Sequence, residues 1–292
     1  MATNEAVINK TKKSSLAKRS WNKMLRNKLA MIGLIIFVIM VLASVLAPLL
    51  TSYNPSTVDM DSITLAPSRE HLLGTDKLGR DVFARILYGG RVSVYVSICG
   101  ALVGTLIGTI LGGIAGYFGG KIDKFLVRLS EVFLTFPNMI LILILVGIVG
   151  QGVNNLIIIF SLTGWMTTFR MVRNEFLSLR EETYVEVCKA FGISEVSIMF
   201  KHILPNTLSP IMVSTTLNIA GYILQEAGLS FLGLGVPSTI PTWGNIMNAA
   251  KSVEVLKNYW WLWLSPGLVI SIFVLAINYL GDGLRDVLDP KQ

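Results

Sequence analysis

Charged residues are few in this sequence, at 15% of its 292 residues, whereas 52% are hydrophobic and the mean hydropathy is +0.62. This composition excludes an ordinary soluble protein and is typical of a membrane protein. A helix that crosses a bilayer needs about 20 apolar residues. Six runs reach that length: 29–50, 92–116, 132–150, 154–172, 207–228 and 262–284. They leave no room for a separate soluble domain, so we expect an all-α membrane protein with six transmembrane helices.

Histidine and cysteine are also scarce, with two of each in the chain. An intramembrane enzyme needs a nucleophile with a base, or a cluster of metal ligands. The two histidines lie in separate polar segments, and neither His-Glu-x-x-His nor Gly-x-Ser-x-Gly occurs. We therefore expect no catalytic residue, no metal site and no enzymatic activity in this chain.

The net charge of +7 indicates membrane orientation rather than binding to nucleic acid. Eight of the 25 Lys and Arg residues precede residue 29. With a cytoplasmic N-terminus, the cytoplasmic segments hold 18 basic residues and the outer segments hold seven, as the positive-inside rule expects. Both termini are then cytoplasmic. Cys99 lies within a span and Cys188 in the cytoplasm, so a disulfide between them is not expected.

This topology divides the chain into five parts. Residues 1–28 form a cytoplasmic basic tail, and residues 29–50 form a first span that is too long for a cleaved secretion signal. An extracytoplasmic segment follows at 51–91. Residues 92–284 form a core of five transmembrane helices, and residues 285–292 form a cytoplasmic C-terminus.

The polar stretch at 180–205 separates two spans and carries the most informative pattern in the chain. Thr183 suits a helix N-cap, and Gly192 suits the left-handed residue that ends a helix. Four residues between them share one apolar helix face: Tyr184, Val187, Cys188 and Phe191. Ser194 can cap a second helix, which Pro205 then ends or kinks.

A helix of two or three turns is marginal by itself in water, so the apolar face of this short helix needs a partner. One hypothesis places the face in a groove on another protein. The other places the helix flat on the bilayer surface. Surface helices usually carry an excess of Lys and Arg, whereas this helix is nearly balanced in charge. The balance favours a protein partner.

The second span carries five glycines at intervals of four residues: Gly100, Gly104, Gly108, Gly112 and Gly116. In lipid, such spacing lets two helix backbones approach closely. We expect the stripe to pack against another helix, either in this chain or in a second subunit. The glycines do not form a phosphate loop, because the spacing is wrong and no Ser or Thr follows Lys121. We expect no ATP binding by this chain.

Two residues within the predicted spans stand out chemically. Pro137 lies early in the third span, where it should kink the helix. A broken backbone suits the lining of a cavity, although many spans carry proline for packing alone. Glu226, near the outer end of the fifth span, is costly beside lipid and normally faces the bundle interior or a wet cavity. We expect Glu226 to be either a pathway or gate residue or half of a buried ion pair.

The outer segment contains two charged pairs at i and i+4 spacing, Asp76 with Arg80 and Asp81 with Arg85. This spacing predicts a helix on the outer membrane surface. Asp76, Arg80 and Asp81 are candidates for docking another protein. A solvated helix start explains them equally well, because exposed ion pairs do not identify a site. His71 is expected to be an ordinary surface histidine.

The polar stretch resembles the coupling loop of ABC-importer permeases, which runs Glu-Ala-Ala, then Gly, then Ile-x-Leu-Pro. Four residues keep that spacing: Glu186, Gly192, Leu204 and Pro205. Three depart from it: Val187, Cys188 and His202. Three more strings resemble the oligopeptide, dipeptide and nickel subfamily of these permeases. They are Gly-Thr-Asp-x-Leu-Gly-Arg-Asp at 74–81, Glu-Ala-x-Leu-Ser-Phe-Leu-Gly-Leu-Gly at 226–235 and Leu-Gly-Asp-Gly-Leu-Arg-Asp at 280–286.

This resemblance implies a type I ABC importer permease fold with a cytoplasmic coupling helix. It implies a second homologous permease, one or two ATP-binding subunits that hold ATP and Mg, and an extracytoplasmic substrate-binding protein. The implied function is import, most strongly of peptides, across a bacterial or archaeal cell membrane. The residues implied to contact the ATPases are Tyr184, Glu186, Val187, Cys188, Ala190, Phe191, Gly192, Leu204 and Pro205. An autonomous ion-coupled carrier or channel is the alternative, but it should bury several charges rather than mainly Glu226.

Overall fold

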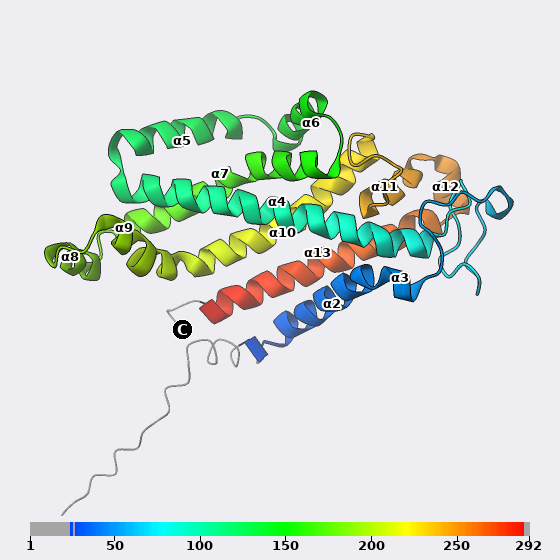
Figure 1. Ribbon diagram of the computed structural model, residues 1–292, viewed down its shortest axis with the longest axis horizontal. Coiled ribbons are helices and arrows are strands. Elements are labelled where there is room, and N and C mark those ends of the chain that lie inside the picture. The colour runs from blue at the N-terminus through cyan, green and yellow to red at the C-terminus, as the bar shows by residue number, and fades with distance from the viewer. Residues whose placement is uncertain (1–23, 26, 289–292) are drawn as a thin grey trace, which may run out of the picture.

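The computed structural model describes residues 24–25 and 27–288, so most of the basic tail predicted at 1–28, and the last residues of the chain, lie outside the described part. Five long helices run side by side along the molecule (Figure 1). They are α2 (Lys28–Val45), α4 (Val82–Phe118), α7 (Val153–Leu179), α10 (Leu208–Leu232) and α13 (Trp261–Leu288). Each is long and apolar enough to cross a membrane, α10 together with the short helices before it. These helices match five of the six predicted spans.

The third predicted span, 132–150, is not one straight helix. The structure divides this region into α5 (Gly120–Leu134) and α6 (Asn138–Val149), which meet at an angle of 88°. Pro137 occupies the N-cap of α6. It lacks a backbone N–H, and its ring disfavours helical geometry at Phe136, so the break falls where the sequence predicts a kink. The described residues contain a sixth crossing only if α5 and α6 count together as one bent span.

Helix α4 packs closely along α7 through the glycine stripe. A Cβ atom added to Gly108, Gly112 or Gly116 would lie 2.6–2.7 Å from a carbonyl oxygen of α7. Gly100 and Gly104 face the same helix, because their nearest α7 neighbours would be Phe160 and Ser161. The stripe therefore packs within this chain. Close backbone approach replaces the side-chain burial that drives helix packing in water.

The remaining long helices complete the bundle on the other side of α4 (Figure 1). Helix α2 meets α13 at Gly33, where an added Cβ would lie 2.6 Å from the carbonyl oxygen of Ala276. Helix α10 contacts both α4 and α13. The largest fully buried side chains of the central core include Phe160, Phe273 and Trp243.

Short helices gather at the two ends of the bundle (Figure 1). At one end, called here the α8 end, lie α8 (Thr183–Ala190), α9 (Glu195–Ser197), a π-helical turn η2 (Ile198–Ile203) and a 3₁₀ turn η3 (Leu204–Thr207). The opposite end, the α12 end, holds α3 (Ala47–Leu50), η1 (Met60–Ser62), α11 (Trp243–Met247), η4 (Asn248–Lys251) and α12 (Val253–Asn258). The bundle thus separates the polar stretch 180–205 from the Asp76–Asp81 segment.

Candidate functional site

Helix α8 projects from the bundle and is held by a few specific contacts. Val185 is fully buried in a cluster that includes Val172 and Ile198. Lys189 places its ammonium 5.8 Å from the ring centroid of Tyr117 at the end of α4. These contacts fix the orientation of α8. Val185, its buried residue, is not one of the four residues that the sequence predicts on the apolar face.

The rest of α8 presents an exposed apolar surface. Phe191 is 81% exposed, Val187 is 47% exposed and Tyr184 is 37% exposed. Cys188 is half-buried and packs against the same cluster as Val185. Three of the four predicted face residues therefore form the free surface. Other implied contact residues are exposed around it: Glu186, Ala190, Gly192 and Pro205. Leu204 is half-buried. Desolvation raises the pKa of the Tyr184 phenol above its usual value.

The ends of α8 follow the predicted turn chemistry only in part. Thr183 is the first residue of the helix, and Glu182 takes the N-cap position without a side-chain hydrogen bond. The prediction that Thr183 is the N-cap is therefore wrong. The turn through 180–182 places the N-cap one residue earlier, so that Thr183 already has helical geometry. Gly192 has φ of +72°, the left-handed conformation that ends a helix. Ser194 occupies the N-cap of α9, but its side chain makes no capping hydrogen bond.

Two arginines fix the C-terminal end of α7, just before α8, to the neighbouring helices. Arg180 donates from Nη1 to the carbonyl oxygens of Gly116, at 3.2 Å, and Tyr117, at 3.4 Å. Arg173 forms a bidentate pair with Asp123 of α5, with Nη2 to Oδ2 at 2.6 Å. Neither contact could be predicted from the sequence, because the partners are 50 or more residues apart and share no helical spacing. Together they connect the end of α7, which leads directly into α8, to α4 and α5.

Glu226 lies inside the bundle, on α10, and is only 1% exposed. Its carboxylate accepts hydrogen bonds from the hydroxyls of Ser230 and Thr242, both at 2.8 Å, and from Ser93 of α4 at 3.4 Å. A Cβ atom added to Gly244 would lie 2.8 Å from Glu226 Oε2. The carboxylate therefore joins three parts of the fold: α10, α4 and the start of α11.

Glu226 has no ion-pair partner within the described residues. The alternative of a buried ion pair is therefore wrong, since hydroxyl groups from Ser and Thr satisfy the oxygens instead. Its role as a pathway or gate residue stays a prediction. Across 24–25 and 27–288, no group of three His, Cys, Asp or Glu side chains could hold a metal ion.

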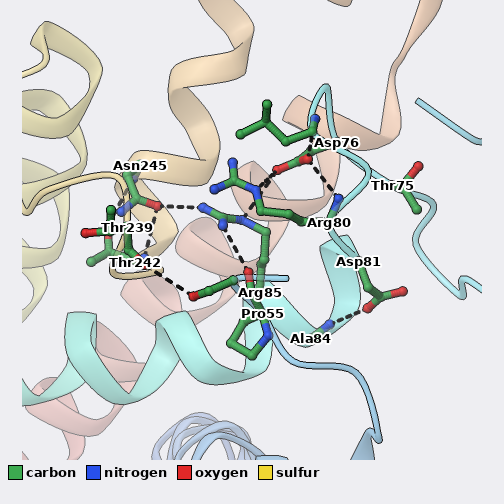
Figure 2. A network of polar contacts seen from close by, with 12 residues as sticks. Pro55, Thr75, Asp76, Arg80, Asp81, Ala84, Arg85, Thr239, Thr242 and Asn245 are labelled. Carbon is green, nitrogen blue, oxygen red and sulfur yellow. Dashed lines mark hydrogen bonds and ion pairs between the residues drawn. The ribbon is translucent and has the colours of Figure 1, made fainter. Parts of the chain in front are cut away.

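The Asp76–Asp81 segment forms a tight loop that positions the start of α4 at the α12 end (Figure 2). Asp76 Oδ1 accepts from the backbone N–H of Leu78 at 2.8 Å and of Arg80 at 3.0 Å. Its Oδ2 accepts from Arg80 Nε at 2.7 Å and lies 3.7 Å from Arg85 Nε. Arg85 also donates to the carbonyl oxygen of Pro55, at 3.1 Å, and to Asn245 Oδ1, at 3.4 Å.

This loop corrects two expectations from sequence. The segment is not a helix before Val82, because Gly74 and Gly79 take φ near +70° and fold it into turns. Asp81 does not pair with Arg85. It caps α4, with Oδ1 accepting from the Ala84 N–H at 2.6 Å.

His71 is buried rather than exposed, at 7%, which corrects the expectation of a surface histidine. Its Nδ1 lies 2.9 Å from Asp81 Oδ2, so it supplies a second partner for the capping carboxylate. Its ring packs against Tyr53, with centroids 4.9 Å apart. Neither contact has a sequence spacing that would reveal it.

Comparisons with known proteins match nearly the whole chain. The model of the binding-protein-dependent transport system inner membrane component family matches residues 108–292. The model of the N-terminal transmembrane domain of oligopeptide transport permease C matches residues 15–67. The oligopeptide transport system permease protein of Bacillus subtilis is 37% identical over 292 residues, covering 99% of this chain and 95% of that protein. The dipeptide transport system permease protein of the same organism is 38% identical, covering 95% and 86%.

Solved structures of a transporter show a similar arrangement of helices. The methionine ABC transporter MetNI, in an inward-facing conformation, aligns with a TM-score of 0.58 at 17% identity. The alignment covers 70% of this chain and 96% of that chain. At this identity the likeness concerns the fold alone.

Proposed function

Because this chain belongs to the family of binding-protein-dependent transport system inner membrane components, we propose that it forms half of the translocation pathway of an ATP-driven peptide importer. Membership makes it a multi-pass permease subunit of an ABC transporter in the inner membrane, with the type I importer permease fold. Peptides are supported as substrates because relatives that match almost end to end are dipeptide and oligopeptide permeases.

The observation that carries this proposal is the exposed apolar surface of α8, a helix that a few specific contacts hold in place. Phe191 is 81% exposed, although burying a Phe side chain is favourable by about 1.5–3 kcal/mol. An apolar side chain at the tip of a polar segment gains that energy when it enters a groove on another protein. In the proposed complex, the groove belongs to an ATP-binding subunit.

The contacts at the base of α8 support a mechanical role. Movement of an ATPase subunit would pull on α8, and the Arg180 and Arg173 contacts would carry the pull to α4, α5 and α7. Helices α4 and α7 pack backbone against backbone at the glycine stripe and would therefore move as one body. Rocking of this body would alternate the pathway between inward-open and outward-open states.

The remaining parts of the complex follow from this assignment. A second homologous permease supplies the other half of the pathway, and one or two ATPase subunits bind ATP and Mg. This chain has no catalytic role and carries no cofactor. The α8 end and both termini lie in the cytoplasm, so a substrate-binding protein docks at the α12 end. There, Asp76, Arg80 and Asp81 shape the loop that it would meet.

The experiment that tests the proposal is gentle purification of the tagged chain from its native membrane, followed by identification of the co-purified subunits. We expect a second permease and one or two ATPases in fixed stoichiometry, with ATP hydrolysis stimulated by a peptide-loaded binding protein. A chain that purifies alone, yet moves a solute in liposomes, would overturn the proposal in favour of an autonomous carrier.

A further inference from the structure

A cavity of about 280 Å³ lies between the α5–α6 break, the middle of α7 and one face of α10. Polar side chains line it from three elements: Asn138 on α6, Thr163 and Thr167 on α7, and Asn218 and Gln225 on α10. Glu226 does not line it. The cavity thus places polar groups away from both ends of helices that cross the membrane, where polar groups are costly unless they face protein or water.

Two of these polar groups lack partners. Asn218 Nδ2 and Gln225 Oε1 are buried atoms without a hydrogen bond inside the part of the chain that the structure describes. Leaving such a group unsatisfied costs about 1–3 kcal/mol. A buried donor and a buried acceptor on the same wall are explained by a ligand that supplies the complementary acceptor and donor.

The spacing of the two side chains suits one kind of ligand. Asn218 and Gln225 are seven residues apart on α10, which corresponds to about 10 Å along the helix axis at 1.5 Å per residue. An extended peptide advances about 3.3 Å per residue, so its carbonyl and N–H groups three residues apart have the same separation. A peptide main chain therefore fits an amide donor and an amide acceptor placed in this way.

The walls of the cavity also limit the chemistry of the ligand. No Asp, Glu, Lys, Arg or His side chain is among its lining residues. It therefore offers no ion-pair partner for a charged side chain, whereas its amides and hydroxyls can bind neutral peptide groups. Gly164 and Gly221 reduce the bulk of the walls. A Cβ added to Gly221 would meet only Gln225 Nε2, at 3.9 Å, so the cavity can accept additional atoms there.

We infer that this cavity is a transient binding site for the main chain of the transported peptide, with Asn218 and Gln225 as its hydrogen-bonding residues. The inference rests on the proposed function and assigns it a location in this chain. Binding through the main chain is insensitive to the peptide side chains. The site therefore guides passage, and selection among peptides belongs to another component of the complex.

The test uses the complete transporter in proteoliposomes, with the radiolabelled alanine peptide, from di-alanine to penta-alanine, that the wild-type complex takes up best. Gly221→Leu fills the cavity. Its matched control is Gly147→Leu on α6, where an added Cβ meets nothing within 4 Å. We expect Gly221→Leu to reduce peptide uptake at least tenfold and Gly147→Leu to leave it within twofold. Both variants should assemble with their partner subunits.

A second measurement reports binding directly. In a background with Cys99→Ala and Cys188→Ala, Gln225→Cys and Leu224→Cys are alkylated with iodoacetamide, with and without the alanine peptide. Leu224 is the neighbouring residue, is 53% exposed and does not line the cavity. We expect the peptide to slow alkylation at position 225 several-fold and to leave position 224 unchanged.

The outcomes separate this inference from the proposed function. Normal uptake by an assembled Gly221→Leu transporter, with no protection at position 225, would overturn the site and leave the peptide importer standing. Protection at position 225 by a partner subunit alone, without peptide, would assign the cavity to a subunit interface and also overturn the site. A wild-type complex that takes up no peptide would overturn both.

Discussion

At the scale of single residues, Glu226 shows how a carboxylate is kept inside a membrane helix bundle. Its oxygens are satisfied by Ser230, Thr242 and Ser93, so its removal leaves several buried hydroxyl groups without their acceptor. Removal of the carboxylate would therefore weaken the packing of α10 against α4 and α11. The residue thus has a structural role whether or not it also lines the pathway.

We expect Glu226→Ala to lower the free energy of unfolding by about 2 kcal/mol, because each unsatisfied buried group costs about 1–3 kcal/mol. Glu226→Gln should cost less, since its amide retains an acceptor oxygen at the same place. Thermal unfolding of the purified transporter in detergent measures both. If Glu226→Gln melts like the wild type but no longer transports, the negative charge itself is required, as the pathway hypothesis predicts. Equal melting of Glu226→Ala and wild type would contradict the structural role.

Asp76 provides a second test at this scale. Its carboxylate accepts from the backbone N–H groups of Leu78 and Arg80 and from the Arg80 side chain. We expect Asp76→Ala to loosen the loop and to speed hydrogen exchange at those two amides. Glu254→Ala is the control at the same end, because Glu254 is 59% exposed and its ion pair with Lys77 spans 3.4 Å. Such exposed pairs contribute about 0–1 kcal/mol.

One result would contradict this role of Asp76 in the loop. Unchanged exchange at the Leu78 and Arg80 amides in Asp76→Ala would show that the carboxylate does not organise the loop. In that case, the remaining role for Asp76 would be an external contact. Weaker binding of the substrate-binding protein by a well-folded Asp76→Ala transporter would support that role.

Residue roles that depend on local spacing could be predicted from sequence, whereas roles that depend on long-range contacts could not. The left-handed Gly192 follows from its place after an apolar helical pattern. The burial of His71 does not, because it depends on Asp81, ten residues away, turning back to cap α4. The Arg173–Asp123 pair likewise depends on α5 folding back along α4.

At the scale of helices, the α4–α7 pair depends on glycine at the points of closest approach. We expect Gly108→Ala to destabilise the protein by about 1–3 kcal/mol, the usual cost of overpacking a tight contact. The new methyl group would lie 2.6 Å from the carbonyl oxygen of Trp165. Gly147→Ala is the control, as its position on α6 is open. Similar melting temperatures for the two variants would show that the backbones are not in close contact at Gly108.

Helix α8 offers a prediction about partners rather than stability. Phe191→Asp should release the ATPase subunits while the bundle stays folded, because a charge entering an apolar groove is costly and the side chain makes little contact within the chain. Met60→Asp is the matched control, with an exposed apolar residue, at 68%, replaced at the other end of the molecule. The readout is the amount of ATPase that co-purifies with each tagged variant. Full retention with a folded Phe191→Asp chain would remove Phe191 from the interface.

For the helices, periodicity and composition predict where most spans lie but not how they bend. Five spans follow from apolar runs of sufficient length, and the family resemblance follows from dispersed motifs. The sequence also marks the break at Pro137, but not its angle of 88°, because the angle depends on how α5 and α6 pack against α7. The 74–81 string suggested a helix from charge spacing, yet the positive φ of Gly74 and Gly79 makes it a loop.

At the scale of the whole molecule, a bundle of long helices joins two specialised ends. The α8 end carries an apolar surface suited to a partner protein, and the α12 end carries loops tied together by charged hydrogen bonds. Between them, α4 and α7 run through the bundle in close contact. This arrangement is suited to passing motion from one side of a membrane to a pathway within it.

The decisive measurement is peptide uptake by the reconstituted complex when ATP and the binding protein are each supplied on one side only. We expect uptake when ATP meets the α8 end and the peptide-loaded binding protein meets the α12 end, and none when the two are exchanged. We also expect loss of uptake in Phe191→Asp. Uptake by this chain alone, driven by an ion gradient without ATPase subunits, would contradict ATP-driven import through a multi-subunit complex.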